Sequence, residues 1–147
     1  HQELETLARV PYHESRDRLR AMAKEQGARP WYAFLSEAAV SGFESAYLKE
    51  AVLEATLLTA RTGLACRLHK SRTGEYPAGL ESLVPGLLSE APIDPFTGKP
   101  LIYRREGAGF VVYSVGSNQK DDGGRSTYNI TGLIMDKDDD WPWSEPR

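Results

Sequence analysis

Oxygen-bearing side chains crowd the C-terminal part of the chain, where six aspartates between Asp121 and Asp140 are offset only by Arg125 and Lys137. Such a run must be solvated, paired with cations or wrapped around a metal ion. Calcium suits these residue types, because it takes about six to eight hard oxygens from carboxylates, amides and backbone carbonyls. A solvated acidic loop is the competing interpretation of the same composition.

The candidate ligands lie on both sides of a glycine pair. Val115 offers a backbone carbonyl where a strand is expected to end, and Asn118 offers an amide oxygen. Gly123 and Gly124 allow the backbone to turn tightly enough to bring several oxygens inward. The negative charge comes from Asp121, Asp122, Asp138, Asp139 and Asp140.

Other chemistries find less support in the sequence. An EF-hand is excluded, because Trp141 stands at the glycine position of that loop and Arg147 at the position of its glutamate. Cys66 is the only cysteine, so neither an intrachain disulfide nor a thiolate zinc site can form within the chain. No serine elbow and no phosphate-binding glycine pattern is present. We therefore expect a protein that is not an enzyme; a hydrolase built on paired acids is the remaining catalytic alternative.

A long helix is expected to carry the rest of the fold. From Trp31 to about Lys70 the chain has no proline, and apolar residues recur at spacings near three and four. The pattern predicts an amphipathic spine helix over residues 31–70, with its apolar positions at Trp31, Leu35, Ala38, Phe43, Ala46, Tyr47, Leu53, Leu57, Leu64 and Leu68. Residues 1–30 are expected to form two short amphipathic helices, because Pro11 interrupts the pattern and Gly27 ends it.

The C-terminal half is expected to form a small sheet. Residues 71–100 are predicted to hold a short helix opened by Pro77 and then an extended, proline-rich segment. Two strands at about 101–105 and 110–114, joined by a hairpin turn, are followed by a third near 133–135 (Leu133, Ile134, Met135). The expected fold class is α+β, with the spine helix packed on an antiparallel sheet of about three strands. Residues 31–147 would form one domain, of which 101–147 hold the sheet and the acidic loop.

The overall composition narrows the function classes. The formal charge of −3 gives no basic surface for nucleic acid. No apolar run approaches the length of a membrane span. The chain opens at His1, so we expect a native start upstream, with which an export signal or membrane anchor would have been removed.

Five short motifs follow one another along residues 50 to 141. They are Tyr76-Pro77 after the helix, Asp94-Pro95-Phe96-Thr97-Gly98-Lys99-Pro100, Leu101-Ile102-Tyr103, Phe110-Val111-Val112-Tyr113-Ser114-Val115-Gly116, and Asp121-Asp122-Gly123-Gly124. In this order they resemble the C-terminal domain of the major pseudopilin of type II secretion. The resemblance implies a pseudopilin-like fold and a structural or assembly role in a secretion or pilus-type system of the bacterial envelope. The protein would then be periplasmic, envelope-bound or extracellular, with protein partners or copies of itself.

The resemblance also implies a particular set of calcium ligands. Carried over residue by residue, these are the Val115 carbonyl, the Asn118 side chain in place of an aspartate, Asp139 and Asp140, with Asp122 as the next choice. The amide at Asn118 lowers the charge of such a site and hence its affinity for calcium.

The N-terminal part departs from that family. Gly42-Phe43-Glu44 resembles its leader cleavage site only superficially, because Lys49, Glu50 and Glu54 fall where the filament-forming helix must be apolar. Residues 1–30 have no counterpart there. The alternative function is therefore a metal-free, soluble protein-binding module of the envelope, which would use Trp141, Trp143 and the N-terminal helices.

Overall fold

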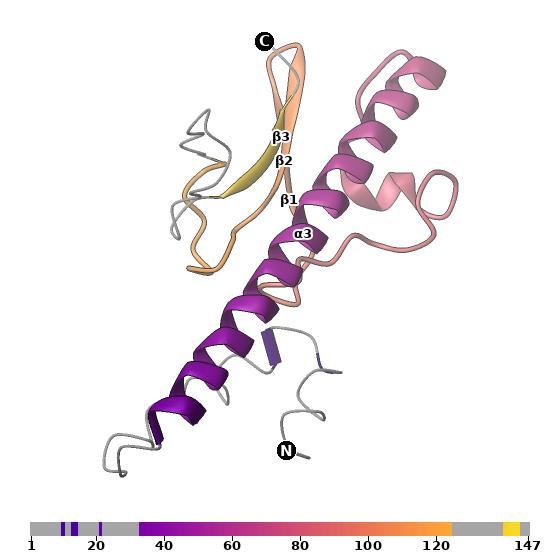
Figure 1. The fold of residues 1–147 in the computed structure, drawn as a ribbon. Coiled ribbons are helices and arrows are strands. Elements are labelled where there is room, and N and C mark those ends of the chain that lie inside the picture. Colours follow the sequence, from indigo (N-terminus) through magenta and orange to yellow (C-terminus); the bar gives the residue numbers. More distant parts are fainter. Residues whose placement is uncertain (1–9, 11–12, 15–20, 22–32, 125–139, 145–147) are drawn as a thin grey trace. The chain divides into compact units, whose positions relative to one another are not determined.

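The computed structural model describes Val10, His13, Glu14, Ala21 and residues 33–124 and 140–144, with the backbone alone for 33–44, 141, 143 and 144. The chain divides into two compact units, His1–Val52 and Leu53–Arg147. The elements are helix α3 (Ala33–Thr73), the short 3-10 helix η1 (Leu80–Leu83), and the strands β1 (Ile102–Glu106), β2 (Gly109–Ser114) and β3 (Trp141–Ser144) (Figure 1). The sheet and the acidic loop belong to the second unit, which the following paragraphs describe.

The predicted long helix is present as α3, and its C-terminal end is well defined. Gly74 has a φ of 90°, a conformation that suits glycine, and its amide donates to the Lys70 carbonyl over 2.8 Å. Lys70 and Arg72 lie in the last turn, where cations interact favourably with the helix dipole. None of the helices in the described ranges combines the length and hydropathy that a membrane span requires.

The buried face of this part of α3 consists of small residues and differs from the predicted one. Ala55, Thr59, Thr62 and Cys66 are almost fully buried. Thr59 donates its hydroxyl hydrogen bond to the Ala55 carbonyl over 2.9 Å, so that this buried hydroxyl has a partner within the helix. Of the predicted apolar positions, Tyr47 is buried, whereas Leu53, Leu57, Leu64 and Leu68 are exposed, so the predicted apolar side is not the buried side along this part of the helix.

The core joins this small-residue face to the sheet and to the segment after the helix. Figure 1 shows the β1–β2 hairpin beside the C-terminal part of α3. Small side chains allow close approach of the helix, and large apolar side chains from the other elements fill the interface. The cluster comprises Ala65, Cys66, Tyr76, Leu80, Leu83, Leu88, Leu101, Phe110 and Val112.

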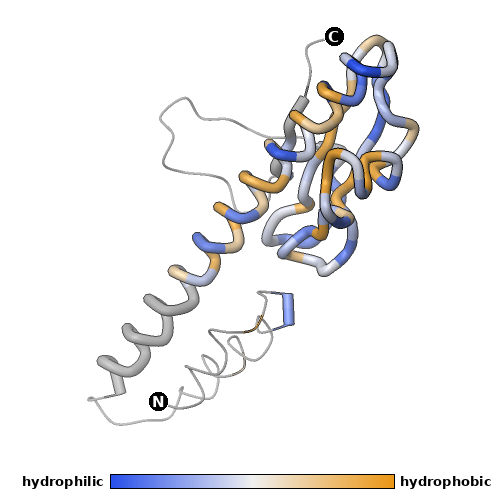
Figure 2. Tube along the Cα trace, turned by 90° about the vertical axis from the view of Figure 1, so that its right-hand side faces the viewer, coloured by the Kyte–Doolittle hydropathy of each residue, from blue (hydrophilic) through white to orange (hydrophobic). Residues whose placement is uncertain are grey.

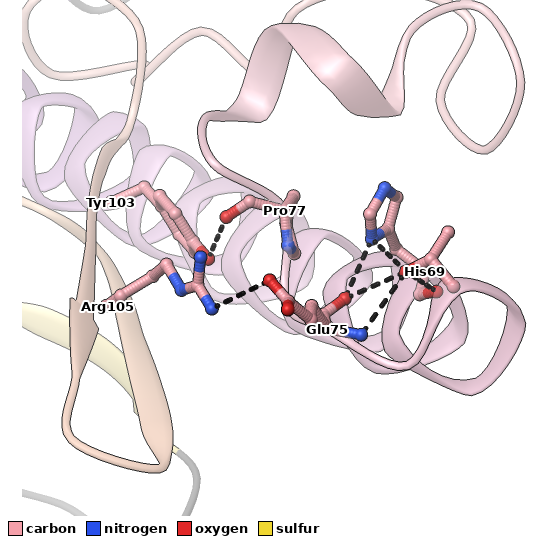
Figure 3. Close-up of polar contacts among 6 residues, drawn as sticks. His69, Glu75, Pro77, Tyr103 and Arg105 are labelled. Atoms are coloured by element: carbon pink, nitrogen blue, oxygen red, sulfur yellow. Dashed lines mark hydrogen bonds and ion pairs between the residues drawn. The ribbon is translucent and has the colours of Figure 1, made fainter.

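Polar contacts fasten β1 to the chain that leaves α3 (Figure 3). The Tyr103 hydroxyl donates to the Pro77 carbonyl over 2.7 Å, and an Arg105 guanidinium nitrogen lies 3.6 Å from a Glu75 carboxylate oxygen. The Tyr76 ring packs 4.8 Å from the Phe110 ring, measured between centroids. The Tyr-Pro pair thus fixes the distance between the helix end and the hairpin.

The sheet has the antiparallel order β1-β2-β3. β2 lies in the middle and is buried along its whole length, whereas β3, among the described strands, pairs only with β2. Pro142 is tolerated in β3 because an edge strand does not need every amide. The α+β class with a long helix on a small antiparallel sheet is confirmed. The segment 133–135, predicted as a strand, lies outside the described residues, and β3 occupies a segment for which no strand was predicted.

Candidate metal centre

Asp94 holds the backbone at the start of the candidate site in place. The residue is 2% exposed, and its carboxylate accepts three hydrogen bonds. One oxygen accepts from the Phe96 amide and the Ser114 hydroxyl, each over 2.9 Å, and the other accepts from the Val115 amide over 3.0 Å. The Asp-Pro turn is thereby bonded to the end of β2, and the position of Val115 is fixed by a buried carboxylate.

The loop that follows β2 closes back on the same turn. Gly116 has a φ of 68°, and its carbonyl accepts a hydrogen bond from the Gln119 amide over 3.2 Å. The Gln119 side-chain amide donates to the Phe96 carbonyl over 2.5 Å. These bonds hold the first half of the acidic loop against the Asp-Pro turn.

Asn118 and Asp122 are brought together across this loop. The Asn118 side-chain nitrogen donates to an Asp122 carboxylate oxygen over 2.8 Å. The Asn118 side-chain oxygen accepts from the Lys120 amide, also over 2.8 Å. Because a carbonyl oxygen has two lone pairs, this oxygen retains the capacity to bind a cation as well.

Asp121 is held by one hydrogen bond from β2 and one from its own loop, and the nearby Arg104 charge also favours its ionised form. One of its oxygens accepts from the Tyr113 hydroxyl over 2.7 Å and from the Gly123 amide over 2.9 Å. These hydrogen bonds, first that from Tyr113, lower the pKa of Asp121 below its ordinary value. Burial, followed by the contact with Asp121, raises the pKa of Tyr113. The other face of the loop is held by Arg104, which donates to the Gly123 carbonyl over 2.9 Å.

Asp140 is the unusual group of the site. It immediately precedes β3 and is 1% exposed. One carboxylate oxygen, Oδ2, accepts from the Gly124 amide over 2.7 Å, whereas Oδ1 has no hydrogen-bond partner among the described residues. Burial raises the pKa of Asp140, and the charges of Asp122 and Asp121 raise it further, against the lowering effect of the Gly124 and Asp122 backbone amides. A buried carboxylate oxygen without a partner is energetically costly, and a bound cation would remove that cost.

Gly124 is the residue that allows the loop to approach Asp140. Its φ is 73°, which disfavours any side chain, and a Cβ atom placed there would lie 3.1 Å from the Tyr113 ring. The loop therefore packs its backbone directly on β2 and directs the Gly124 amide at the Asp140 carboxylate.

The predicted ligands are partly brought together. Asn118 donates a hydrogen bond to Asp122, and the negative charge of Asp122 is close enough to Asp140 to raise the pKa of its carboxyl. The Val115 amide is bonded to Asp94, at the start of the same loop. Asp139 lies outside the described residues, as do Asp136 and Asp138. Within the described ranges, no three acidic, histidine or cysteine side chains form a metal-binding group, so a full ligand set needs the amide oxygen, the carbonyl and Asp139.

Sequence reasoning missed the anchoring role of Asp94. The sequence marks Asp94 only as the first residue of an Asp-Pro motif, which is a common turn opening. The available signal was Ser114 at the end of the predicted strand, because its hydroxyl is a suitable partner for a buried carboxylate.

A separate cavity of about 230 Å³ lies between α3 and the segment that precedes β1. It is lined by two carboxylates, those of Glu54 and Glu90, together with Arg61 and apolar side chains that include Leu58 and Ile93. Among the described residues neither a histidine nor a cysteine lines it, so this lining offers paired acids but no nucleophile with an adjacent imidazole base.

In comparisons with known proteins, the chain matches no protein family model, no curated protein and no solved structure.

Proposed function

We propose that this chain is a pseudopilin-like structural or assembly protein of a bacterial envelope secretion or pilus-type system, and that its acidic C-terminal loop binds calcium. The observation that carries the calcium proposal is Asp140, a residue that is 1% exposed and whose Oδ1 has no hydrogen-bond partner in the described part of the chain. Asp121 and Asp122 add negative charge beside it. A buried oxygen without a partner and the negative charges beside it together favour the binding of a cation.

The ion would be held by Asp140 together with Asp122, Asn118, the Val115 carbonyl and Asp139. In the absence of metal, Asp122 repels the Asp140 carboxylate and burial disfavours its charge. A divalent cation would offset both effects and join the loop to β2 and β3. The loop would then present a rigid surface for contacts with protein partners or further copies of the chain.

The chain order supports the pseudopilin-like assignment. A long helix is followed by the Tyr-Pro pair, the Asp-Pro turn, the strand that ends at Ser114, and the acidic loop. The Tyr-Pro pair, the Asp-Pro turn and the strand end each have a structural role. The Pro77 carbonyl accepts from the Tyr103 hydroxyl, and the Asp94 carboxylate accepts from the Ser114 hydroxyl at the end of β2. The amide at Asn118 favours a weak site, and weak sites of about 10⁻⁴ to 10⁻³ M suit extracellular calcium concentrations. A periplasmic or extracellular location is consistent with that affinity.

Thermal unfolding of the chelator-treated protein with and without calcium tests the proposal. Calcium at about 100 times the dissociation constant should stabilise the folded state by about 2.7 kcal/mol, which raises the Tm by roughly 4 °C or more. Asp140→Asn should abolish this shift, because the amide keeps an acceptor for the Gly124 amide but removes the charge. Asp121→Asn is the matched control, because both donors to Asp121 can still be accepted by its oxygen.

Two outcomes would contradict the calcium proposal. One is a wild-type Tm that stays unchanged in about 10 mM calcium, a concentration well above the weak-site range. The other is an equal loss of the shift in Asp140→Asn and Asp121→Asn, which would assign the effect to general charge repulsion. Either result would favour the metal-free protein-binding module.

A further inference from the structure

The cavity between α3 and the segment 88–93 combines charged and apolar side chains. Its volume is about 230 Å³, and its lining belongs entirely to the second unit of the chain. Glu54, Leu58 and Arg61 form the helix wall, and their spacings of four and three place them on one face of α3. In Figure 2, hydrophilic blue and hydrophobic orange segments alternate along this helix in the same way.

The second wall of the cavity, the segment 88–93, contributes one more carboxylate and an apolar surface. The carboxylate belongs to Glu90, and the apolar surface includes Leu88 and Ile93. Ile93 is 44% exposed, so part of its side chain is open to a ligand. Together with Leu58, these side chains provide a surface on which a hydrocarbon chain can pack.

The charged groups of the cavity do not neutralise one another by direct pairing. Glu54 and Arg61 are about 10.5 Å apart along the helix axis, at about 1.5 Å per residue. Among the described residues, no ion pair includes Glu54, Glu90 or Arg61. All three residues are exposed, so a ligand from solution can reach them. Two negative charges and one positive charge are therefore available to that ligand.

We propose that this cavity binds a free basic amino acid of the lysine class. Lysine carries two ammonium groups and one carboxylate, which match the two carboxylates and the one guanidinium of the lining. The carboxylate of the ligand pairs with Arg61, and its ammonium groups pair with Glu54 and Glu90. Its aliphatic chain lies on Leu58 and Ile93, because the stem of a long cationic side chain packs well on apolar surface.

Size and charge discriminate against other classes of ligand. The volume of about 230 Å³ lies below the range of about 300 to 1,000 Å³ that drug-sized ligands occupy, so the cavity suits a molecule of the size of one amino acid. A ligand with carboxylates alone would meet Glu54 and Glu90, and one with ammonium groups alone would meet Arg61, and like charges in contact oppose binding. The lining shares no residue with the acidic loop, so this inference stands independently of the calcium proposal.

Titration of the isotope-labelled intact chain with L-lysine, in chelator and at constant ionic strength, tests the proposal through its amide chemical shifts. The amides of residues 54–61 and 88–93 should shift and saturate with a Kd of about 1 mM or below, the weak limit of specific binding. Shifts that do not saturate by about 10 mM, ten times that limit, would overturn the proposal. So would saturable shifts confined to other parts of the chain.

Three analogues of lysine each lack one of its charges. Norleucine lacks the side-chain ammonium, cadaverine lacks the carboxylate, and ε-aminocaproate lacks the α-ammonium, and each should bind at least about threefold more weakly than lysine. An analogue that binds as tightly as lysine would contradict the proposal, because the missing charge would then have no partner in the cavity. Nα-acetyl-lysine amide resembles a lysine within a protein chain. If it bound as tightly as free lysine, the occupant would be a protein partner and not a free amino acid.

Substitutions in the lining assign each charge to its partner. Arg61→Gln should weaken lysine binding at least about threefold but should not weaken cadaverine binding, because cadaverine has no carboxylate. Glu54→Gln and Glu90→Gln should each weaken the binding of lysine. Glu81→Gln is the matched control, because Glu81 is also exposed but lies outside the lining, and it should leave the affinity unchanged. An equal loss of lysine and cadaverine binding in Arg61→Gln, or an effect of Glu81→Gln as large as those in the lining, would overturn the proposal.

Discussion

Two buried aspartates in this protein have opposite roles, and their hydrogen bonds explain the difference. Asp94 accepts three hydrogen bonds that engage both of its oxygens. Asp140 is buried to the same degree, but its hydrogen bond from the Gly124 amide engages Oδ2, and Oδ1 has no hydrogen-bond partner among the described residues. The Asp122 amide also acts on this carboxylate and lowers its pKa. Because a buried carboxylate with a full set of donors is already stabilised, Asp94 is a structural group. A cation bound to Asp140 would stabilise the carboxylate oxygen that lacks a hydrogen-bond partner.

Asp94→Asn should destabilise the fold by about 3 kcal/mol. The amide would direct an N–H group at one of the buried donors, either the Val115 amide or the pair formed by Phe96 and Ser114, and leave that donor without an acceptor. Urea unfolding followed by circular dichroism measures the change in free energy. Ser114→Ala, which removes one neutral donor to Asp94 and the acceptor of the Gly116 amide, should cost less, about 1 to 2 kcal/mol. If both variants had the same small effect, the proposed anchoring role of Asp94 would be wrong.

At the scale of residues, the sequence predicted which polar side chains lie near one another but not how deeply they are buried. Asn118 and Asp122 were chosen by residue type and resemblance, and they are in contact. The burial of Asp140 was not visible in the sequence, because a run of aspartates is normally solvated. It follows from the pairing of β3 with β2, a contact between distant parts of the chain.

At the scale of elements, Gly124 controls how closely the acidic loop approaches β2. Gly124→Ala should destabilise the protein by about 1 to 2 kcal/mol because of its positive φ alone. The new Cβ would also lie 3.1 Å from the Tyr113 ring, which displaces the loop and its amide from Asp140. Chemical denaturation measures the loss of stability, and the calcium-dependent Tm shift should shrink as well.

Gly86→Ala is the matched control for this loop variant. An added Cβ at Gly86 has open space, with no heavy atom within 4 Å, and its φ is not positive. The substitution should therefore change stability by less than about 0.5 kcal/mol. A cost at Gly86 equal to that at Gly124 would show that the loss at Gly124 does not come from its φ or from Tyr113.

Elements with a strong local pattern were predicted, and those defined by distant contacts were not. The absence of proline and the recurrence of apolar residues indicated α3, and the glycines near 107 indicated the hairpin. β3 was missed because Pro142 argues against a strand and its partner lies far away in the sequence. The face of α3 was also assigned wrongly. Periodicity identifies a leucine row, but small residues such as Ala55 and Cys66 form the buried side, and the leucines remain exposed.

At the scale of the whole molecule, the two shifted carboxyls make opposite contributions to the pH dependence of stability. The pKa of Asp121 is lowered, so the folded state releases this proton more readily than the unfolded state does. Its stabilising contribution is present above the unfolded pKa and is lost as the pH falls through the folded pKa. The pKa of Asp140 is raised from 3.8, so in the calcium-free protein its contribution is lost as the pH rises from that value through the raised pKa.

Calcium binding should reverse the contribution of Asp140. Because the ion binds only the deprotonated carboxylate, protons compete with it, and the dissociation constant should fall as the pH rises through the raised pKa and then level off. Isothermal titration calorimetry at a series of pH values above about 4, the ordinary carboxyl range, measures this dependence. In the calcium-free protein, Asp140→Asn should remove the loss of stability in the same interval and leave the contribution of Asp121 at lower pH. An affinity that is independent of pH across that interval would mean that calcium, if bound, is held without Asp140.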